Sequence, residues 1–300
     1  MKKSVSMLLA ALMLTGALAG CGSSASTTSG TQADSNADSG VSGAITVISR
    51  EDGSGTRGAF IELTGVEEKT ADGKKVDNTT ADAEIANKTD VVLTSVAGNE
   101  KAIGYISLGA LNDTVKAVKV DGAEATVDNV KAGAYKLSRP FNIATKGEPT
   151  GVAKDFINFI LSKEGQAVVT DNKYIAVNDA ADSFVSDGSS GQIAVGGSSS
   201  VSPVMEKLIE AYKSVNPNAS IDLQTSDSTS GMTGAMDGTF AIGMASRELK
   251  DEEAAQLTGT AIALDGIAVI VNPANTIDEL SMDQIKSIYV GDITDWGDLA

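Results

Sequence analysis

The chain has 300 residues, a formal net charge of −17, one cysteine and no histidine. So acidic a chain lacks the cationic surface on which nucleic-acid binding depends, and without histidine it has no His-based general catalysis, no Ser-His-Asp triad and none of the commonest zinc ligand sets. A small anion is not excluded, because distant surface charge is screened over about 8–10 Å at ordinary ionic strength.

The N-terminal segment has the pattern of an exported, lipid-anchored protein. Two lysines precede an apolar run, Val5 to Ala19, that is too short to span a bilayer. The run ends in Leu18-Ala19-Gly20-Cys21, which resembles the lipobox of bacterial lipoproteins, where the cysteine is lipidated and becomes the N-terminus. We predict a signal peptide over residues 1–20, a lipid on Cys21 that anchors the protein at the extracytoplasmic face of the cell membrane, and a flexible linker over 21–44. The alternative is an ordinary secretory signal with a free Cys21.

A loop between a predicted strand and a predicted helix is the first candidate anion site. Residues 45–48 are typical of a strand and residues 59–63 of a helix start. Two glycines let the loop backbone turn its N–H groups toward one point, two hydroxyls add donors, and the helix adds its positive N-terminal end. Arg50 offers a planar fork of donors to the same anion, and Asp52 either holds that guanidinium or accepts a proton from the ligand. The loop reads Ser49-Arg50-Glu51-Asp52-Gly53-Ser54-Gly55-Thr56.

The middle of the chain predicts a polar excursion followed by strands and one helix. Residues 65–82 are polar and contain the turn signal Asp72-Gly73, so they are expected on the surface. Strands are predicted over residues 91–96, 102–106, 115–120 and 125–126, an extended segment over 135–144, an amphipathic helix over 151–164, and a polar joint over 178–191.

Two further donor-rich loops follow in the C-terminal half. Gly196-Gly197-Ser198-Ser199-Ser200 lies between a predicted strand and a helix from Val201 to Tyr212, and residues 225–231 precede a helix that runs to Asp237. One such loop is more often only a helix cap. Three of them indicate two lobes that close on one ligand.

The remaining elements continue the alternation of strands and helices. Strands are predicted over residues 220–224, 241–246 and 262–271, and helices over 251–257 and 281–289. Strands alternating with helices throughout the chain predict the α/β class with two lobes.

The motifs resemble a known family, the phosphate-binding proteins of bacterial ABC phosphate importers, which have the type 2 periplasmic-binding-protein fold. That resemblance implies two lobes with the ligand cleft between them, inorganic phosphate as ligand, no cofactor or metal, and the membrane permease of the importer as partner for a chain expected to be a monomer. The matching motifs cover nearly all of residues 45–300 and are Ser49 to Thr56, Gly197-Ser198-Ser199-Ser200-Val201-Ser202-Pro203, Ser228-Thr229-Ser230-Gly231, Gly243-Met244-Ala245-Ser246-Arg247-Glu248-Leu249, Leu264-Asp265-Gly266-Ile267-Ala268-Val269 and Ile293-Thr294-Asp295-Trp296.

The order of these motifs differs from the family's order. In a typical member the Gly-Ser-Ser-Ser motif comes first and the Thr-Asp-Trp segment runs on into the Asp-Gly-Ser-Gly-Thr loop, whereas here that join is cut. The chain is therefore predicted to be circularly permuted, with residues 178–192 as a flexible bridge between the family's old termini. The new ends, Ala44 and Ala300, are then expected to be neighbours.

The resemblance also assigns ligands and lobes. One lobe (45–140 and 266–300) would bind phosphate through Arg50, Ser54, Gly55 and Thr56, with Asp52 orienting Arg50, and the other (141–265) through Ser199, Ser200 and Ser228. Some members have an aspartate that accepts a hydrogen bond from protonated phosphate, and this chain has Arg247 at that position. Asp52 and Glu248 are the candidates to replace it, and a structural role for both is the alternative. Extended runs at 138–142 and 264–268 are the predicted lobe crossings, whose hinge closure would signal to the permease.

Two other functions remain open from the sequence. A receptor for another oxyanion, such as sulfate, molybdate or a phosphonate, would use the same donors. A phosphoryl- or acyl-transfer enzyme would need Ser54 or Ser200 as nucleophile with a lysine base. The chain has no Gly-x-x-x-x-Gly-Lys-Ser/Thr loop, which disfavours the enzyme.

Overall fold

The computed structural model describes residues 41–299. The predicted signal peptide, Cys21, most of the predicted linker and Ala300 lie outside the described residues. No helix within residues 41–299 combines the length and the apolar character needed to cross a membrane.

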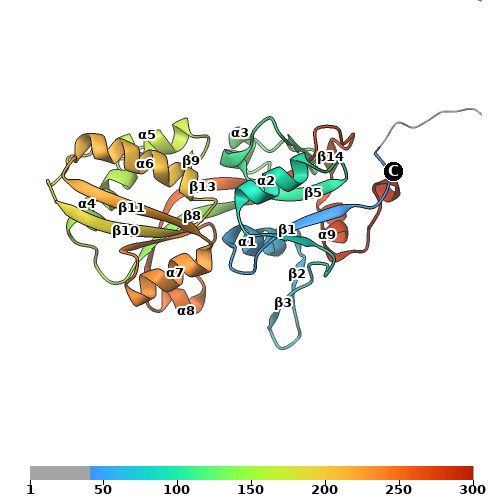
Figure 1. The fold of residues 1–300 in the computed structure, drawn as a ribbon, viewed down its shortest axis with the longest axis horizontal. Coiled ribbons are helices and arrows are strands. Elements are labelled where there is room, and N and C mark those ends of the chain that lie inside the picture. The colour runs from blue at the N-terminus through green and yellow to red at the C-terminus, as the bar shows by residue number, and fades with distance from the viewer. Residues whose placement is uncertain (1–40, 300) are drawn as a thin grey trace, which may run out of the picture. The chain divides into compact units, whose positions relative to one another are not determined.

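One mixed sheet connects the two halves of the described chain (Figure 1). Its strands run in the order β11-β10-β12-β8-β13-β5-β1-β4, and β6 and β9 also pair with β13. The strands are β1 (Thr46–Arg50), β4 (Glu84–Ala86), β5 (Ala102–Ser107), β6 (Lys116–Ala117), β8 (Ser138–Thr145), β9 (Ile175–Ala176), β10 (Gly191–Ser198), β11 (Ala219–Ser226), β12 (Ile242–Ala245) and β13 (Thr258–Val271). The short pairs are β2 (Glu67–Lys69) with β3 (Lys75–Asp77), and β7 (Lys119–Val120) with β14 (Glu279–Leu280).

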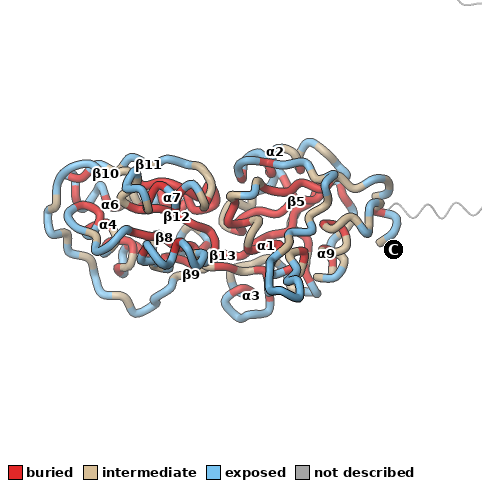
Figure 2. Tube along the Cα trace, turned by 90° about the horizontal axis from the view of Figure 1, so that it is seen from below, coloured by how far each residue is buried: buried red, intermediate tan, exposed pale blue. Residues whose placement is uncertain are grey.

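Strand β13 passes from one hydrophobic core to the other. Its residues 258–266 pair with β8, and its residues 267–271 pair with β5. Apart from Ile175, the buried side chains of the first core come from residues 47–137 and 267–296, and those of the second from 141–263. Figure 2 shows the buried backbone gathered in these two groups. We call residues 45–137 with 267–299 the arginine lobe and residues 141–263 the serine lobe.

Helices cover both parts of the sheet. In the arginine lobe α2 packs on β5 and β1, and in the serine lobe α7 packs on β12 and β10. Local signals set many ends: Ser54 caps the start of α1, Ser281 and Gln284 form a capping box at α9, and Gly65 and Gly291 end these two helices with positive φ. The helices are α1 (Gly55–Thr64), α2 (Thr89–Ala97), α3 (Val127–Lys131), α4 (Gly151–Leu161), α5 (Lys163–Asp171), α6 (Ser202–Val215), α7 (Ser228–Asp237), α8 (Asp251–Ala254) and α9 (Met282–Val290), with 3₁₀ turns over Leu108–Ala110 and Trp296–Leu299.

The prediction of a strand over residues 91–96 is wrong, because this segment is helix α2. The β-branched run favoured a strand, but the helix buries Thr89, Val92, Leu93 and Val96, which is a helical spacing. Gly104 of β5 lets the helix approach closely, since a Cβ there would lie 2.9 Å from methyl groups of Val92 and Val96. Packing has overridden local propensity. Residues 125–126 are likewise not a strand, and Thr126 caps α3.

Residues 178–190 connect β9 to β10 without helix or strand, and they are fastened to the serine lobe. The hydroxyl of Ser186 and the N–H of Asp187 donate to Asp155 at 2.7 and 3.0 Å, and the N–H of Phe184 donates to Glu164 at 2.7 Å. The ring of Phe184 also meets that of Phe159 edge-on, with centroids 5.2 Å apart. The expected flexible bridge is therefore a docked segment.

The first and last described segments lie side by side. Ala44 forms an antiparallel bridge with Asp295, the N–H of Ile45 donates to Thr294 O at 2.8 Å, and that of Trp296 donates to Gly43 O at 3.1 Å. A circular permutation requires such a neighbour relation for Ala44. Ala300 lies outside the described residues, and the permutation itself stays a prediction.

Candidate anion-binding site

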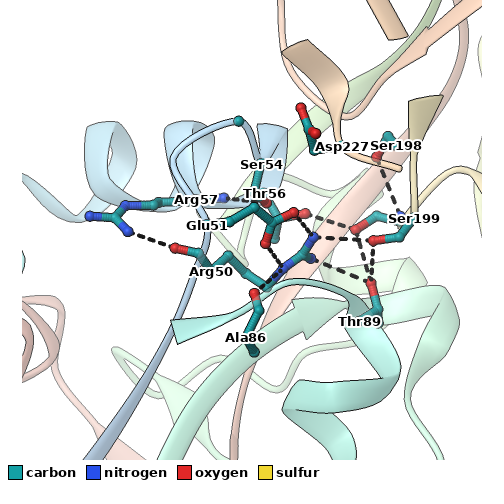
Figure 3. A network of polar contacts seen from close by, with 12 residues as sticks. Arg50, Glu51, Ser54, Thr56, Arg57, Ala86, Thr89, Ser198, Ser199 and Asp227 are labelled. Atoms are coloured by element: carbon teal, nitrogen blue, oxygen red, sulfur yellow. Dashed lines mark hydrogen bonds and ion pairs between the residues drawn. The ribbon is translucent and has the colours of Figure 1, made fainter. Parts of the chain in front are cut away.

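Residues from both lobes meet where α1, α6 and α7 begin (Figure 3). The hydroxyls of Thr56 and Ser200 are 2.8 Å apart, and NH2 of Arg50 donates to the hydroxyl of Ser199 at 3.1 Å. The N–H of Thr229 also donates across the lobes to Gly53 O at 3.1 Å. The predicted site residues Arg50, Thr56, Ser199, Ser200 and Ser228 are all buried. The structure thus brings together segments more than a hundred residues apart in the sequence.

Arg50 is held by Glu51, and the prediction that Asp52 orients it is wrong. Both oxygens of Glu51 accept from the Arg50 guanidinium, each at 2.8 Å, which is a bidentate pair. The side chain of Asp52 is 99% exposed and contacts Arg57 instead, at 3.4 Å. Asp52 lies in the turn after β1, where the chain has reversed direction, so its short side chain faces solvent.

The remaining donors of Arg50 fix its position further. Its Nε also donates to the backbone oxygen of Ala86 at 3.2 Å, and NH1 reaches the hydroxyl of Thr89 at 3.5 Å. Ala86 ends β4, and Thr89 begins α2. A guanidinium with this many partners has few other orientations, so it is preorganised toward the serine lobe.

We call the buried hydroxyl groups of Thr56, Thr89, Ser199, Ser200, Ser228 and Ser246 the hydroxyl cluster. Three of these hydroxyls each accept a hydrogen bond from an N–H group, so their own protons point elsewhere. Ser199 accepts from Arg50, Thr56 accepts from Arg139 at 3.1 Å, and Ser228 accepts from the N–H of Ser246 at 3.1 Å. A hydroxyl carries one proton, and that proton must point away from the N–H that its oxygen already faces. The cluster therefore presents O–H donors, and an oxyanion is a hydrogen-bond acceptor that they could bind.

The glycines of the first loop allow the lobes to approach. A Cβ on Gly55 would lie 2.4 Å from the hydroxyl oxygen of Ser228, and a Cβ on Gly53 would lie 2.3 Å from a carboxylate oxygen of Asp227. Both distances are too short for real atoms. Ser54, between them, acts as the cap of α1 by accepting from the N–H of Arg57 at 3.3 Å.

Glu248 does not reach the hydroxyl cluster. It is exposed, and its carboxylate accepts from Asn142 at 3.3 Å. The neighbouring Arg247 is drawn away by a bidentate pair with Glu253, at 2.7 and 2.8 Å. Among the carboxylates near the cluster, Glu51 binds Arg50, Asp265 binds Arg139, and Asp227 caps α7 by accepting from Ser230 (Figure 3 shows Glu51 and Asp227). None of the three was predicted as the acceptor.

Four residues at the cluster escaped prediction, namely Glu51, Thr89, Arg139 and Ser246. Arg139 lies on β8, is buried, and faces Asp265 of β13 at 3.2 Å. Burial lowers the pKa of Arg139, which the charge of Asp265 opposes, while burial raises the pKa of Asp265 to about 6 against the opposing charge of Arg139. The sequence held little signal for it, because the extended run before Pro140 also contains Lys136 and Ser138.

A cleft of about 640 Å³ lies beside the cluster. Both lobes line it, with Ala59 of α1 on one side, Leu249 on the other, and Arg139 between them. Thr56 and Ser200 lie deeper, each with 1% of its surface exposed. Among residues 41–299 no group of three or more acidic or cysteine side chains could hold a metal ion.

Comparisons with known proteins agree with this geometry. The sequence model described as the PBP superfamily domain matches residues 26–164 and 183–300. The chain belongs to the PBP superfamily. Within this superfamily it is 50% identical over 301 aligned residues to phosphate-binding protein PstS 2 of Streptococcus agalactiae, which covers 99% of this chain and 98% of that protein. A Streptococcus pneumoniae relative with the same name is 51% identical over 85% of this chain and 87% of its own.

A solved structure supports the same fold. The crystal structure of a phosphate-binding protein of a phosphate ABC transporter from Streptococcus pneumoniae TIGR4 has a TM-score of 0.69 and 50% identity. It covers 86% of this chain and 100% of that chain. The predicted α/β fold of the type 2 periplasmic-binding-protein superfamily is confirmed, and with these relatives the chain is a member of the PstS family.

Proposed function

We propose that this chain captures inorganic phosphate for an ABC importer by binding it between the two lobes. The observation that carries the proposal is the buried hydroxyl cluster between the lobes. In it, the hydroxyls of Ser199 and Thr56, from opposite lobes, each accept a hydrogen bond from an arginine, so their protons are available to a ligand. A dehydrated oxyanion needs such donors, and the starts of α1, α6 and α7 add backbone N–H groups and positive helix ends. The relatives named as phosphate-binding proteins have the same family membership.

The proposed ligands come from both lobes. In the arginine lobe they are Arg50, Ser54, Gly55 and Thr56, and in the serine lobe Ser199, Ser200 and Ser228. Glu51 takes the orienting role first assigned to Asp52. Because the anion contacts both lobes only when they are together, its binding energy favours the closed arrangement. On binding, hydroxyls that now contact each other, such as Thr56 and Ser200, would turn their protons to anion oxygens.

Lobe closure is the proposed signal to the membrane permease. The lobe limits 45–140 with 266–300 and 141–265 are supported by the split between the two cores, and β8 and β13 are the crossing strands on which bending would occur. The predicted circular permutation is compatible with this geometry, since Ala44 and Asp295 adjoin.

The proposed location is the extracytoplasmic face of the cell membrane, with a monomer tethered by a lipid on Cys21. The motif Leu18-Ala19-Gly20-Cys21 supports the tether. A Cys21→Ser variant is expected to move from the membrane fraction to the medium, and an unchanged membrane fraction would contradict the lipid anchor.

The contacts of the two candidate nucleophiles favour binding over catalysis. Ser54 caps α1, and Ser200 contacts the hydroxyls of Thr56 and Thr89. None of these described contacts involves a lysine base, which a serine nucleophile without histidine would need. Sulfate, molybdate and phosphonates remain alternatives to phosphate, because a set of donors serves any oxyanion.

Titration calorimetry with phosphate and with sulfate, at pH 6 and pH 8, tests the proposal. The wild type is expected to bind phosphate tightly and sulfate weakly, and Arg50→Met to lose phosphate binding by about 100-fold or more, since several charge-assisted hydrogen bonds depend on it. The matched control is Arg247→Met with Glu253→Gln, which removes another buried arginine together with its partner; Arg247 makes no described contact with Thr56, Ser199 or Ser200. Equal affinity for the two anions would contradict the assignment of phosphate.

A further inference from the structure

A second arginine reaches the proposed phosphate site from the strand that joins the lobes. Arg139 lies on β8 and exposes 3% of its surface. Its NH2 group donates to the hydroxyl of Thr56 at 3.1 Å. Its Nε and NH1 groups are buried without a hydrogen-bond partner among the described residues. Burying a charged group with unpaired donors costs free energy of folding. The stability of the fold alone therefore does not explain why an arginine lies here.

The contact with Thr56 parallels the contact of Arg50 with Ser199. Each guanidinium donates through NH2 to one hydroxyl, at 3.1 Å in both cases. An arginine has no acceptor, so Thr56 must accept from Arg139, and the single proton of its hydroxyl is directed to another partner. Without Arg139 the hydroxyl could rotate and present a lone pair to the anion, which would repel it.

We propose that Arg139 is a positioning residue for anion capture, which fixes the hydroxyl of Thr56 as a donor to the bound oxyanion. Asp265 of β13 holds the same NH2 group that donates to Thr56, with its carboxylate oxygen 3.2 Å away. The inference rests on the proposed function, because it assigns to Arg139 a role in binding the same anion.

The surroundings of Asp265 show that its own position is fixed. The hydroxyl of Ser107 donates to it at 3.0 Å from β5, and the N–H of Gly109 approaches at 3.5 Å. Arg50 on β1, Tyr174 before β9 and Tyr105 on β5 are the other titratable groups whose charges bear on this pair. Asp265 neutralises Arg139 when it is ionised, so the guanidinium can be buried beside Thr56 without adding a net charge.

A structural role alone would predict a different pattern of mutational effects. Removing Arg139 by itself leaves Asp265 buried and unpaired, which destabilises the fold whatever Arg139 does for the ligand. The informative variant is therefore the charge-free pair Arg139→Met with Asp265→Asn. The matched control is Arg247→Met with Glu253→Gln, which neutralises the other buried pair, 2.7 Å apart, outside the hydroxyl cluster.

A mutant cycle on phosphate affinity, measured by calorimetry on the full chain, tests the inference. Thr56→Val and the charge-free pair are each expected to weaken phosphate binding by about 10- to 100-fold. Combined, they are expected to cost no more than about twofold beyond the larger single loss, because both remove the same donor. Combining the charge-free pair with Ser199→Ala is expected to multiply the two losses, since Arg50 orients Ser199. The control pair is expected to bind like the wild type.

Several outcomes would overturn the inference. A charge-free pair that folds, as judged by thermal unfolding, and binds phosphate like the wild type would do so. Losses that multiply when the pair is combined with Thr56→Val would show that Arg139 acts independently of Thr56. If the charge-free pair does not fold, the apolar pair Arg139→Leu with Asp265→Leu replaces it, since apolar residues often replace a buried ion pair without loss of stability, and an equal cost of Thr56→Val in that pair and in the wild type would overturn the inference.

Failure of the proposed function has a separate signature. In that case the wild type itself would not bind phosphate, whatever the variants do. Suppose instead that the wild type binds phosphate, that Arg50→Met loses this binding, and that the charge-free pair keeps it. That result would contradict the role of Arg139 and leave the proposed phosphate-receptor function standing.

Discussion

Two buried polar networks in this molecule differ in what they leave unused. In the serine lobe, Asp155 accepts from Ser186, Asp187 and Tyr212 at 2.7, 3.0 and 2.7 Å, and also from Asn216 at 3.1 Å. Every one of these donors has found an acceptor. Between the lobes, by contrast, polar groups are left over: Arg50 and Arg139 donate to hydroxyls whose own protons point elsewhere, and Nε and NH1 of Arg139, like Oδ2 of Asp265, have no hydrogen-bond partner within the described chain.

The difference separates structure from function. A saturated network rigidifies the fold, whereas a network with surplus donors is costly until an acceptor arrives. The Asp155 network fastens the bridge 178–190 to α4 and α6, whereas the hydroxyl cluster between the lobes has donors available to bind an anion. Mutations should therefore divide cleanly into those that change stability and those that change affinity.

The largest expected effect is on the Asp155 network. Asp155→Ala is expected to lower the free energy of unfolding by about 3–5 kcal/mol, because it leaves several buried donors unpaired. Urea unfolding followed by circular dichroism measures this change. Phosphate affinity of the folded fraction is expected to stay at the wild-type value. A variant of wild-type stability would contradict the account of the docked bridge.

Ser199→Ala should show the converse pattern. It removes one donor to a charged ligand and is expected to weaken phosphate binding by about 10- to 100-fold, while the unfolding free energy changes by less than about 1 kcal/mol. Calorimetry and urea unfolding on the same preparation give both numbers. If stability fell as much as in Asp155→Ala, the contrast between the networks would be lost.

A smaller effect is expected from blocking the approach of the lobes. Gly55→Ala places a Cβ 2.4 Å from the hydroxyl oxygen of Ser228, so it is expected to weaken phosphate binding by about 10-fold. The control on the same helix is Gly58→Ala, where a Cβ would meet only Arg247 at 3.7 Å, an ordinary contact. Equal affinities of these two variants would contradict the close approach at Gly55.

The sequence predicted what depends on local pattern. The loop from Ser49 to Thr56 and the start of α6 could be recognised because turn and cap signals are contiguous in the chain. Helix α2 was missed because its β-branched residues favour a strand until the packing against Gly104 is known. Glu51 and Asp52 are neighbours, and the direction of the turn after β1 decides which of them binds Arg50. The sequence pattern does not predict that direction.

The contact between Arg139 and Thr56 could not have been predicted from local sequence at all. It joins residues 83 positions apart, on a crossing strand and a helix start, and exists only because the lobes come together. Asp155 was equally hidden, since its four donors come from the bridge and from α6.

The pH dependence of stability should have opposite signs for two aspartates. Burial would raise the pKa of Asp155, but its four hydrogen bonds outweigh this and lower the pKa below the usual value. Its stabilising contribution is present above about pH 4 and is lost as the pH falls below that. For Asp265, burial raises the pKa to about 6, so its contribution is present below about pH 4 and is lost as the pH rises through 6.

Unfolding free energies measured from pH 3 to pH 8 check these signs. Asp155→Asn is expected to flatten the acid limb of the profile, and Asp265→Asn the decline between pH 4 and pH 6. Profiles of both variants parallel to the wild type would contradict the pKa directions of the two carboxyl groups.

The most direct test of the central claim is a crystal structure of the chain grown with phosphate. The account predicts one anion between the lobes, within hydrogen-bond distance of the Arg50 guanidinium and of the hydroxyls of Thr56 and Ser199. Phosphate bound only elsewhere, for example in the adjacent cleft beside Leu249, with these three side chains still bonded as they are now, would contradict it.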